Sequence, residues 1–167
     1  MYDPKTLAPG DVLLMTGRPR LTLGGLLDAA IEWSTVSPFV HAAIVAEGCM
    51  VEALWTVTRS PLDKYAGDGW AYRVQATPEQ AQAAWGWATD RVGQRYGIAE
   101  LMDDALFDAA HIPLYGRVTP HRLTCSGLVS VAYQKAGVNL TWHPFPSPAD
   151  LSFSPLLLGP RPWKGAA

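Results

Sequence analysis

Short apolar runs bounded by turn residues fill the first half of the chain, which is the pattern of β-strands. These runs predict strands over residues 11–16, 40–46, 49–57 and 70–75, with a short strand over 138–140. The stretch 55–69 is broken by Ser-Pro and Gly-Asp-Gly turn signals and is expected to be a loop.

The turn Glu47-Gly48 makes two of these strands a β-hairpin whose register can be worked out. With a two-residue loop, Ala43 lies opposite Glu52, and His41 lies opposite Leu54. His41 and Ala43 share a face, so Glu52 is a diagonal neighbour of His41, at about 7–8 Å between Cα atoms. A three-residue loop would put Glu52 on the other face. Because a buried carboxylate is costly unless it is paired, the two residues form either a structural polar pair or a general base with its orienting group.

Apolar residues at helical spacing predict helices over residues 21–33, 78–92, 98–110 and 124–136, with a further helix beginning at 148. Thr77, Pro78 and Gln80 supply an N-cap, a first-turn proline and a capping box for the second of these helices. Gly137 follows the fourth helix and suits a left-handed C-terminal cap.

Cys125 falls in the first turn of that fourth helix, where unpaired backbone N–H groups and the helix dipole favour a thiolate. Taken alone, it can equally be a buried structural cysteine. His41 and Glu52 supply the base and the orienting carboxylate that a cysteine nucleophile needs. The backbone N–H groups of Cys125 and Ser126 are then expected to stabilise an oxyanion.

Length and composition indicate a globular protein with a single domain over residues 1–167, because 49% of the residues are apolar and 17% are charged. A net charge of −2 without a basic tract argues against a nucleic-acid-binding protein. Cys49 and Cys125 cannot form a disulfide framework, and His121 with Cys125 does not complete a zinc site. No metal or other cofactor is expected.

The first ten residues do not resemble a signal peptide, and no apolar run reaches the roughly 18 residues of a membrane span. We therefore expect a protein without a membrane span that is either cytoplasmic or delivered by a phage.

Four short motifs resemble the NlpC/P60 superfamily of papain-like cysteine hydrolases. They are Pro9-Gly10-Asp11-Val12, Val40-His41-Ala42-Ala43 with Glu52, Gly93-Gln94-Arg95-Tyr96, and Thr124-Cys125-Ser126-Gly127. The histidine motif precedes the cysteine motif here, whereas common members have the reverse order. The chain is therefore similar to the circularly permuted branch, the YiiX/YaeF-like group, which is related to the lecithin:retinol acyltransferases.

This resemblance implies an α+β papain-like fold in which an antiparallel sheet or half-barrel packs against the helix bearing the nucleophile. It implies that Cys125 is the nucleophile, His41 the base and Glu52 the third polar residue. Tyr96 matches the family tyrosine near the active site, where it either binds substrate or packs. Thr124 departs from the family pattern, which usually has Asp at this position.

Three functions fit these observations. The first is a cysteine peptidase or amidase that cleaves amide bonds through a thioester acyl-enzyme, on peptidoglycan stem peptides as in many superfamily members. The second is acyl transfer, or thioester or lipid-amide hydrolysis, as in the acyltransferase relatives, although their Asn-Cys-Glu motif is absent. The third is a catalytically idle wall-binding or phage virion protein. We expect the first, with peptidoglycan fragments as the partner.

Overall fold

The computed structural model describes residues 7–16, 37–65, 67–95, 124–143 and 146–162. Tyr96 and His121 lie outside these residues, and so do the helices predicted over 21–33 and 98–110.

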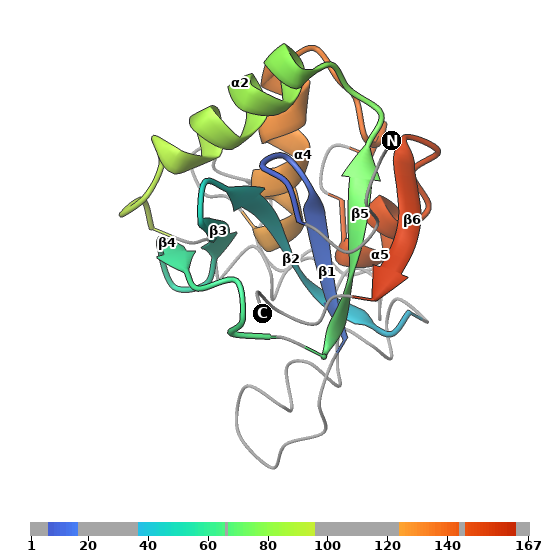
Figure 1. Cartoon of the computed structure of the whole chain (residues 1–167), viewed down its shortest axis with the longest axis horizontal. Helices are drawn as coiled ribbons and strands as arrows, with labels where there is room; N and C mark the ends of the chain where they lie inside the picture. Colours follow the sequence, from blue (N-terminus) through green and yellow to red (C-terminus); the bar gives the residue numbers. More distant parts are fainter. Residues whose placement is uncertain (1–6, 17–36, 66, 96–123, 144–145, 163–167) are drawn as a thin grey trace, which may run out of the picture.

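The described strands form an antiparallel sheet in the spatial order β4-β3-β2-β1-β5-β6 (Figure 1). Their bounds are β1 (Val12–Thr16), β2 (Phe39–Ala46), β3 (Cys49–Ala53), β4 (Val57–Ser60), β5 (Gly69–Val74) and β6 (Leu157–Pro162). β6 comes from the C-terminal part of the chain and pairs with β5 at one edge, while β4 forms the other edge.

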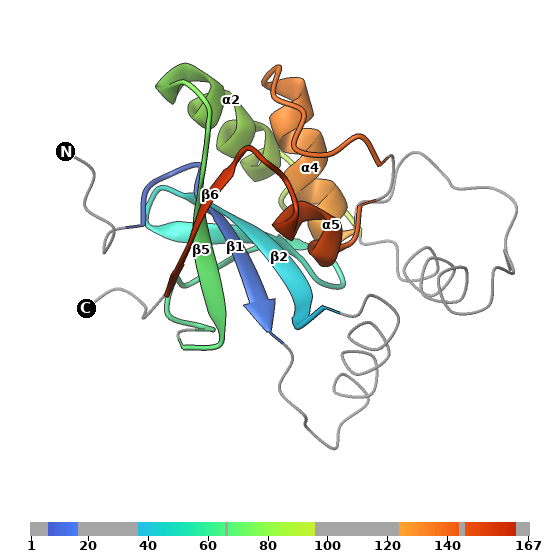
Figure 2. The same ribbon diagram turned by 90° about the vertical axis from the view of Figure 1, so that its right-hand side faces the viewer.

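The described helices lie together against one face of this sheet (Figure 2). They are α2 (Pro78–Thr89), α4 (Cys125–Lys135) and α5 (Pro148–Ser152). The main core forms between α4 and this face, where apolar side chains of both are fully buried: Val12, Leu14, Ala42, Ile44, Val51, Leu128, Val129, Ala132 and Tyr133. The architecture is thus α+β with an antiparallel sheet, as predicted. None of the described helices has the length and apolar character of a membrane span.

The opposite face of the sheet has a smaller apolar core of its own, which includes Leu13, Met15, Ala43, Val45 and Met50. Side chains alternate between the two faces of a strand. Residues 41 and 52 therefore share this second face, because residue 41 is two positions from Ala43 on β2, and residue 52 of β3 lies directly opposite Ala43.

The predicted hairpin register is confirmed, since Ala46 pairs with Cys49 and Ala43 pairs with Glu52. The predicted extension of β3 to residue 57 is wrong, because β3 ends at Ala53. The N–H of Leu54 bonds to the carbonyl of Thr56, a tight turn that sends the chain back as β4. The expected pair of residues 41 and 54 is therefore absent, and the ladder between β2 and β3 stops two pairs earlier, at Ala43–Glu52.

Two strands lie where none was predicted. β4 occupies part of the expected loop 55–69, and its four residues are held by pairing with β3 rather than by a long apolar pattern. β6 contains two prolines, which an edge strand tolerates because its outer N–H groups need no partner. The short strand predicted over 138–140 is not formed, because the N–H of Val138 instead bonds to the carbonyl of Tyr133 and closes the end of α4.

The predicted helix caps are confirmed. Thr77 and Gln80 form the capping box of α2. α5 begins at Pro148 as predicted, with Ser147 as its N-cap. Gly137 follows α4 with a φ of +81°, the left-handed conformation expected there. α2 ends at Thr89 rather than near Val92, because residues 90–93 form a turn.

Candidate active site

Cys125 is the first residue of α4, and its neighbours explain why the helix begins there. The Thr124 hydroxyl accepts a hydrogen bond from the Gly127 N–H at 3.0 Å, which is the geometry of an N-cap. A Cβ at residue 127 would lie 2.7 Å from the Thr124 hydroxyl oxygen, so any side chain there would push against the cap. The Thr124 hydroxyl is therefore the N-cap of α4. Cys125 follows this cap directly and is 4% exposed.

The sulfur of Cys125 lies where the ladder between β2 and β3 ends. The last pair of that ladder is Ala43–Glu52, so the preceding residue, Ala42, lies beyond it. The backbone N–H groups of Ala42 and Ser126 both donate hydrogen bonds to the Cys125 sulfur. Because β3 ends early, the N-terminus of α4 contacts the sheet here, and the backbone N–H groups of Ala42 and Ser126 point to the Cys125 sulfur.

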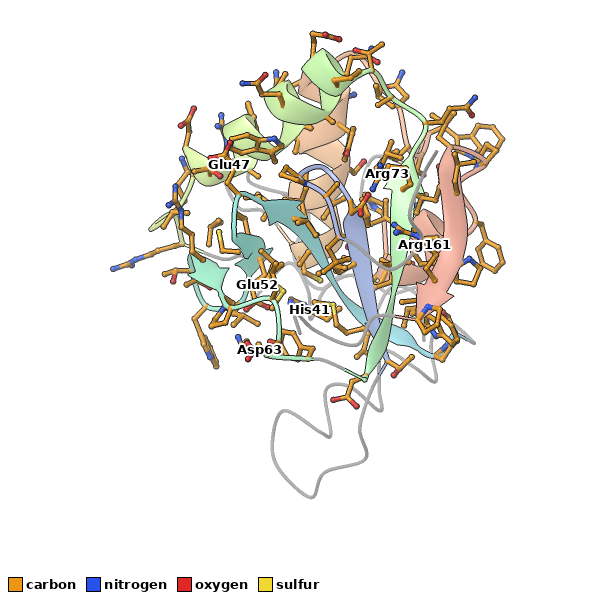
Figure 3. All side chains as sticks on the ribbon, in the orientation of Figure 1. His41, Glu47, Glu52, Asp63, Arg73 and Arg161 are labelled. Atoms are coloured by element: carbon orange, nitrogen blue, oxygen red, sulfur yellow. The ribbon has the colours of Figure 1, made fainter. Side chains whose placement is uncertain are left out.

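His41 and Glu52 come together as the hairpin register predicts. Nε2 of His41 lies 2.7 Å from Oε2 of Glu52, and the two labelled side chains adjoin in Figure 3. His41 also hydrogen-bonds with Cys125, for which its remaining ring nitrogen, Nδ1, is available. The three side chains form one hydrogen-bonded chain in the order Cys125, His41, Glu52.

The carboxylate of Glu52 is fully buried and accepts hydrogen bonds from four side chains. On Oε2, beside His41, the Tyr65 hydroxyl donates at 3.1 Å. On Oε1, the Ser60 hydroxyl donates at 2.5 Å and the Lys64 ammonium at 2.6 Å. A buried carboxylate costs free energy unless it is paired, and these donors supply its pairing.

The electrostatics of the hydrogen-bonded set Cys125–His41–Glu52 favour a thiolate on Cys125 and an imidazolium on His41. Burial by itself lowers the pKa of His41, but the Cys125 thiolate and Glu52 outweigh burial and raise this pKa to about 10. Burial raises the pKa of Cys125, but the His41 charge and the hydrogen bonds from Ala42 and Ser126 outweigh it, so the pKa lies below its ordinary value. Burial likewise opposes ionisation of Glu52, whereas its bonds to His41, Lys64 and Ser60 lower its pKa to about 2.

Of Ser126 and Tyr96, predicted to stabilise an oxyanion or bind substrate, the structure describes Ser126 alone. The Ser126 hydroxyl donates a hydrogen bond to the carbonyl of Pro146 at 2.5 Å, so only the backbone N–H of Ser126 faces the sulfur. Tyr96 lies outside the described residues, and its predicted place near the site stays a prediction.

The Gly10-Asp11 motif lies at the other end of the sheet and has structural contacts. The Asp11 carboxylate is fully buried and forms ion pairs with Arg73 and with Arg161, at 3.1 Å from the latter. Tyr133 of α4 donates its hydroxyl to the carbonyl of Gly10, and a Cβ at Gly10 would lie 2.7 Å from Ala81. This motif therefore joins α4 to the start of β1.

A hollow of about 420 Å³ lies at this same end, between Glu47, Arg73, Gln82, Trp85 and Tyr133. Figure 3 shows Glu47 and Arg73 near α2, well away from His41 and Glu52. The hydrogen-bonded residues Cys125, His41 and Glu52 and this hollow are thus separate sites on the molecule.

The sequence reasoning missed Ser60, Lys64 and Tyr65. Recognition of β4 would have found the first of them, because Glu52 pairs with Thr58 and Ser60 is then its diagonal neighbour on the same face. Lys64 follows through a turn in which its N–H bonds to the carbonyl of Pro61 at 3.2 Å, which brings the side chain back to Ser60. The Ser60-Pro61 pair is the sequence signal for that turn.

Comparison with solved structures gives a likeness in fold. The structure resembles the crystal structure of the metalloprotein YiiX from Escherichia coli O157:H7, with a TM-score of 0.53 and 18% sequence identity. The match covers 93% of this chain and 97% of the other. No protein-family model and no curated protein matches the sequence. The likeness supports a YiiX-like fold.

The described residues of this chain do not suit a metal ion at the Cys125 site. Among them, no group of three or more His, Cys, Asp and Glu side chains is arranged to hold one. Glu52 already binds the Lys64 ammonium and the His41 ring, so both its oxygens face donors or cations rather than an open coordination position.

Proposed function

We propose that this protein is a cysteine hydrolase that cleaves amide bonds through a thioester acyl-enzyme, on a circularly permuted papain-like fold. The observation that carries the proposal is the hydrogen-bonded chain Cys125–His41–Glu52, which begins at a helix N-terminus. A nucleophile beside a base, with the base oriented by a third group, is the arrangement of covalent acyl transfer. No part of the proposal requires a metal ion.

In the first step, the Cys125 thiolate attacks the carbonyl carbon of the amide, and the carbonyl oxygen takes the negative charge. The backbone N–H of Ser126, which bonds to the sulfur in the free enzyme, and that of Cys125 at the start of α4 are suited to stabilise that oxygen. The His41 imidazolium then gives its proton to the leaving nitrogen, the C–N bond breaks, and a thioester and a free amine result.

The charge of the thiolate explains how His41 serves both halves of the reaction. The thiolate is the foremost of the contacts that raise the pKa of His41. When the sulfur becomes part of a thioester, that negative charge is gone and the pKa of His41 falls toward neutrality. The neutral ring then accepts a proton from water, hydroxide attacks the thioester, and Cys125 leaves as the thiolate.

For the substrate class, we propose the amide bonds of peptidoglycan stem peptides. The support is the resemblance of the His, Cys-Ser-Gly and Gly-Asp motifs to superfamily members that act there. Phage delivery and wall-peptide recycling inside the cell both fit this substrate.

The test measures release of free amine from a γ-glutamyl-diaminopimelate peptide by the wild type, Cys125→Ala and Cys49→Ala. Cys49 is a matched control because it is the second free cysteine and is not in contact with His41 or Glu52. We expect hydrolysis by the wild type and Cys49→Ala, and a loss of at least about 10³-fold in Cys125→Ala. Mass spectrometry of a quenched reaction should show the acyl group on the wild type. A chelator should leave the rate unchanged.

Two other outcomes point to different functions. If the wild type cleaves acyl thioesters or lipid amides and releases nothing from the peptide, the hydrolase acts on acyl groups of another class. If Cys125 reacts with iodoacetamide no faster than Cys49 at neutral pH, the thiol is not activated and the catalytic proposal is wrong.

A further inference from the structure

Lys64 differs from an ordinary surface lysine because its ammonium contacts a buried carboxylate. Its ammonium is 2.6 Å from Oε1 of Glu52 and 3.3 Å from the Ser60 hydroxyl, while His41 holds the other carboxylate oxygen. The Lys64 side chain is 34% exposed, whereas Glu52 is fully buried, so Lys64 reaches the carboxylate from the solvent side. Lys64 also lies over the Tyr65 ring, 4.8 Å from its centroid.

This geometry places two cations on one carboxylate whenever His41 is protonated. Among the described residues, the titratable groups in contact with His41 or Glu52 are Cys125 from α4 and Lys64 and Tyr65 from the segment after β4. β1 presents Met15, which does not titrate, opposite His41. Asp63, next to Lys64 in the chain, is exposed and appears at the outer edge of the site in Figure 3.

We propose that Lys64 is a positioning residue of this site, whose positive charge shares Glu52 with His41 and so sets the pH range in which the thiolate–imidazolium pair exists. This inference rests on the proposed function only in taking Cys125 and His41 as the reacting pair.

The sign follows from Coulomb's law. The Lys64 ammonium repels a proton on His41 and weakens the pull of Glu52 on that proton, so it holds the pKa of His41 lower than Glu52 alone would. The same positive charge favours the Cys125 thiolate. Removing the charge therefore moves the titrations of both His41 and Cys125 to higher pH, and the working range moves with them.

A merely structural Lys64 would act differently. It would hold Glu52 in place as the Ser60 hydroxyl does, through a hydrogen bond to the same oxygen, Oε1. Ser60→Ala removes such a bond without changing charge, whereas Lys64→Met removes both the bond and the charge and keeps the length of the side chain. Lys64→Arg keeps the charge. Comparison of these three variants separates the two roles.

The experiment measures the rate of iodoacetamide alkylation against pH, in a Cys49→Ala background so that Cys125 is the reacting thiol. Histidine NMR titration, assigned with a His41→Gln variant, follows the ring in the same proteins. We expect Lys64→Met to raise both titration midpoints by about one pH unit. Lys64→Arg should leave both midpoints unchanged, and Ser60→Ala should move them by less than half as much as Lys64→Met.

The inference is overturned if Lys64→Met and Ser60→Ala shift the midpoints equally, or if Lys64→Met shifts neither while it lowers the unfolding midpoint. Neither readout needs a substrate. A wild type that cleaves no amide, but whose thiol titration moves as expected in Lys64→Met, would remove the proposed hydrolase activity and keep the role of Lys64. If the wild type hydrolyses amides but Lys64→Met shifts neither titration midpoint, the hydrolase activity stands and the proposed role of Lys64 is wrong.

Discussion

The substitution Glu52→Gln tests how much the buried carboxylate contributes to the stability of the site. Gln has nearly the shape of Glu, so the change removes the charge with little change in volume. Side chains that donate hydrogen bonds face both carboxylate oxygens: Lys64 and Ser60 face Oε1, and Tyr65 faces Oε2 beside His41. The amide NH₂ of Gln is also a donor, so whichever way it turns, it faces donors and loses hydrogen bonds.

The magnitude follows from the pKa of Glu52, which the folded protein lowers from 4.5 to about 2. Ionised Glu52 therefore stabilises the folded state by about 3 kcal/mol at pH 7. Because the folded-state pKa is the lower one, this stabilisation is present above pH 4.5 and is lost as the pH falls from 4.5 toward 2. At pH 3.5 it should be about 2 kcal/mol.

The assay is urea unfolding of the wild type and Glu52→Gln at pH 7 and at pH 3.5, with Glu47→Gln as the control. Glu47 lies on the same hairpin but is exposed at its turn, so its substitution should change the unfolding free energy by less than about 0.5 kcal/mol. We expect the difference between the wild type and Glu52→Gln to be about 3 kcal/mol at pH 7 and smaller at pH 3.5. A difference below about 1 kcal/mol at pH 7, or one that does not shrink in acid, would refute the reasoning.

Two further substitutions test the supports of the site, each with a control. Asp11→Asn removes the buried carboxylate that pairs with Arg73 and Arg161 and should lower the unfolding free energy in urea by about 3 kcal/mol. The control Asp63→Asn, at an exposed residue, should leave the unfolding free energy unchanged. The Cys125 alkylation rate should not change in folded Asp11→Asn, and a change would contradict the separation of the two ends of the sheet. Gly127→Ala places a Cβ against the Thr124 hydroxyl and should cost about 1–2 kcal/mol and slow Cys125 alkylation. Gly86→Ala, in α2 with nothing within 4 Å, should instead stabilise the protein by about 0.5–1 kcal/mol, and equal losses in both variants would contradict the cap argument.

The sequence by itself determined the local elements of the site. A two-residue turn at Glu47-Gly48 leaves one register for the hairpin, and side-chain alternation then puts His41 and Glu52 on one face. The helical spacing of the apolar residues after Thr124 likewise places Cys125 in the first turn of α4, because that period involves residues within a few positions of one another. These inferences succeeded because each needs only residues close together in the chain.

Tertiary structure decided what surrounds those elements. Nothing in the spacing between residues 41 and 125 says that α4 begins where the ladder of β2 and β3 ends, because that contact depends on how the helix packs on the sheet. β4 was missed because four residues carry little pattern and β3 supplies the pairing that orders them. With β4 come Ser60 and Lys64, whose side chains reach Glu52 only when the edge of the sheet is formed. The sequence pattern thus identified Cys125, His41 and Glu52 as the candidate site, and the packing of the sheet edge decided which charges surround them.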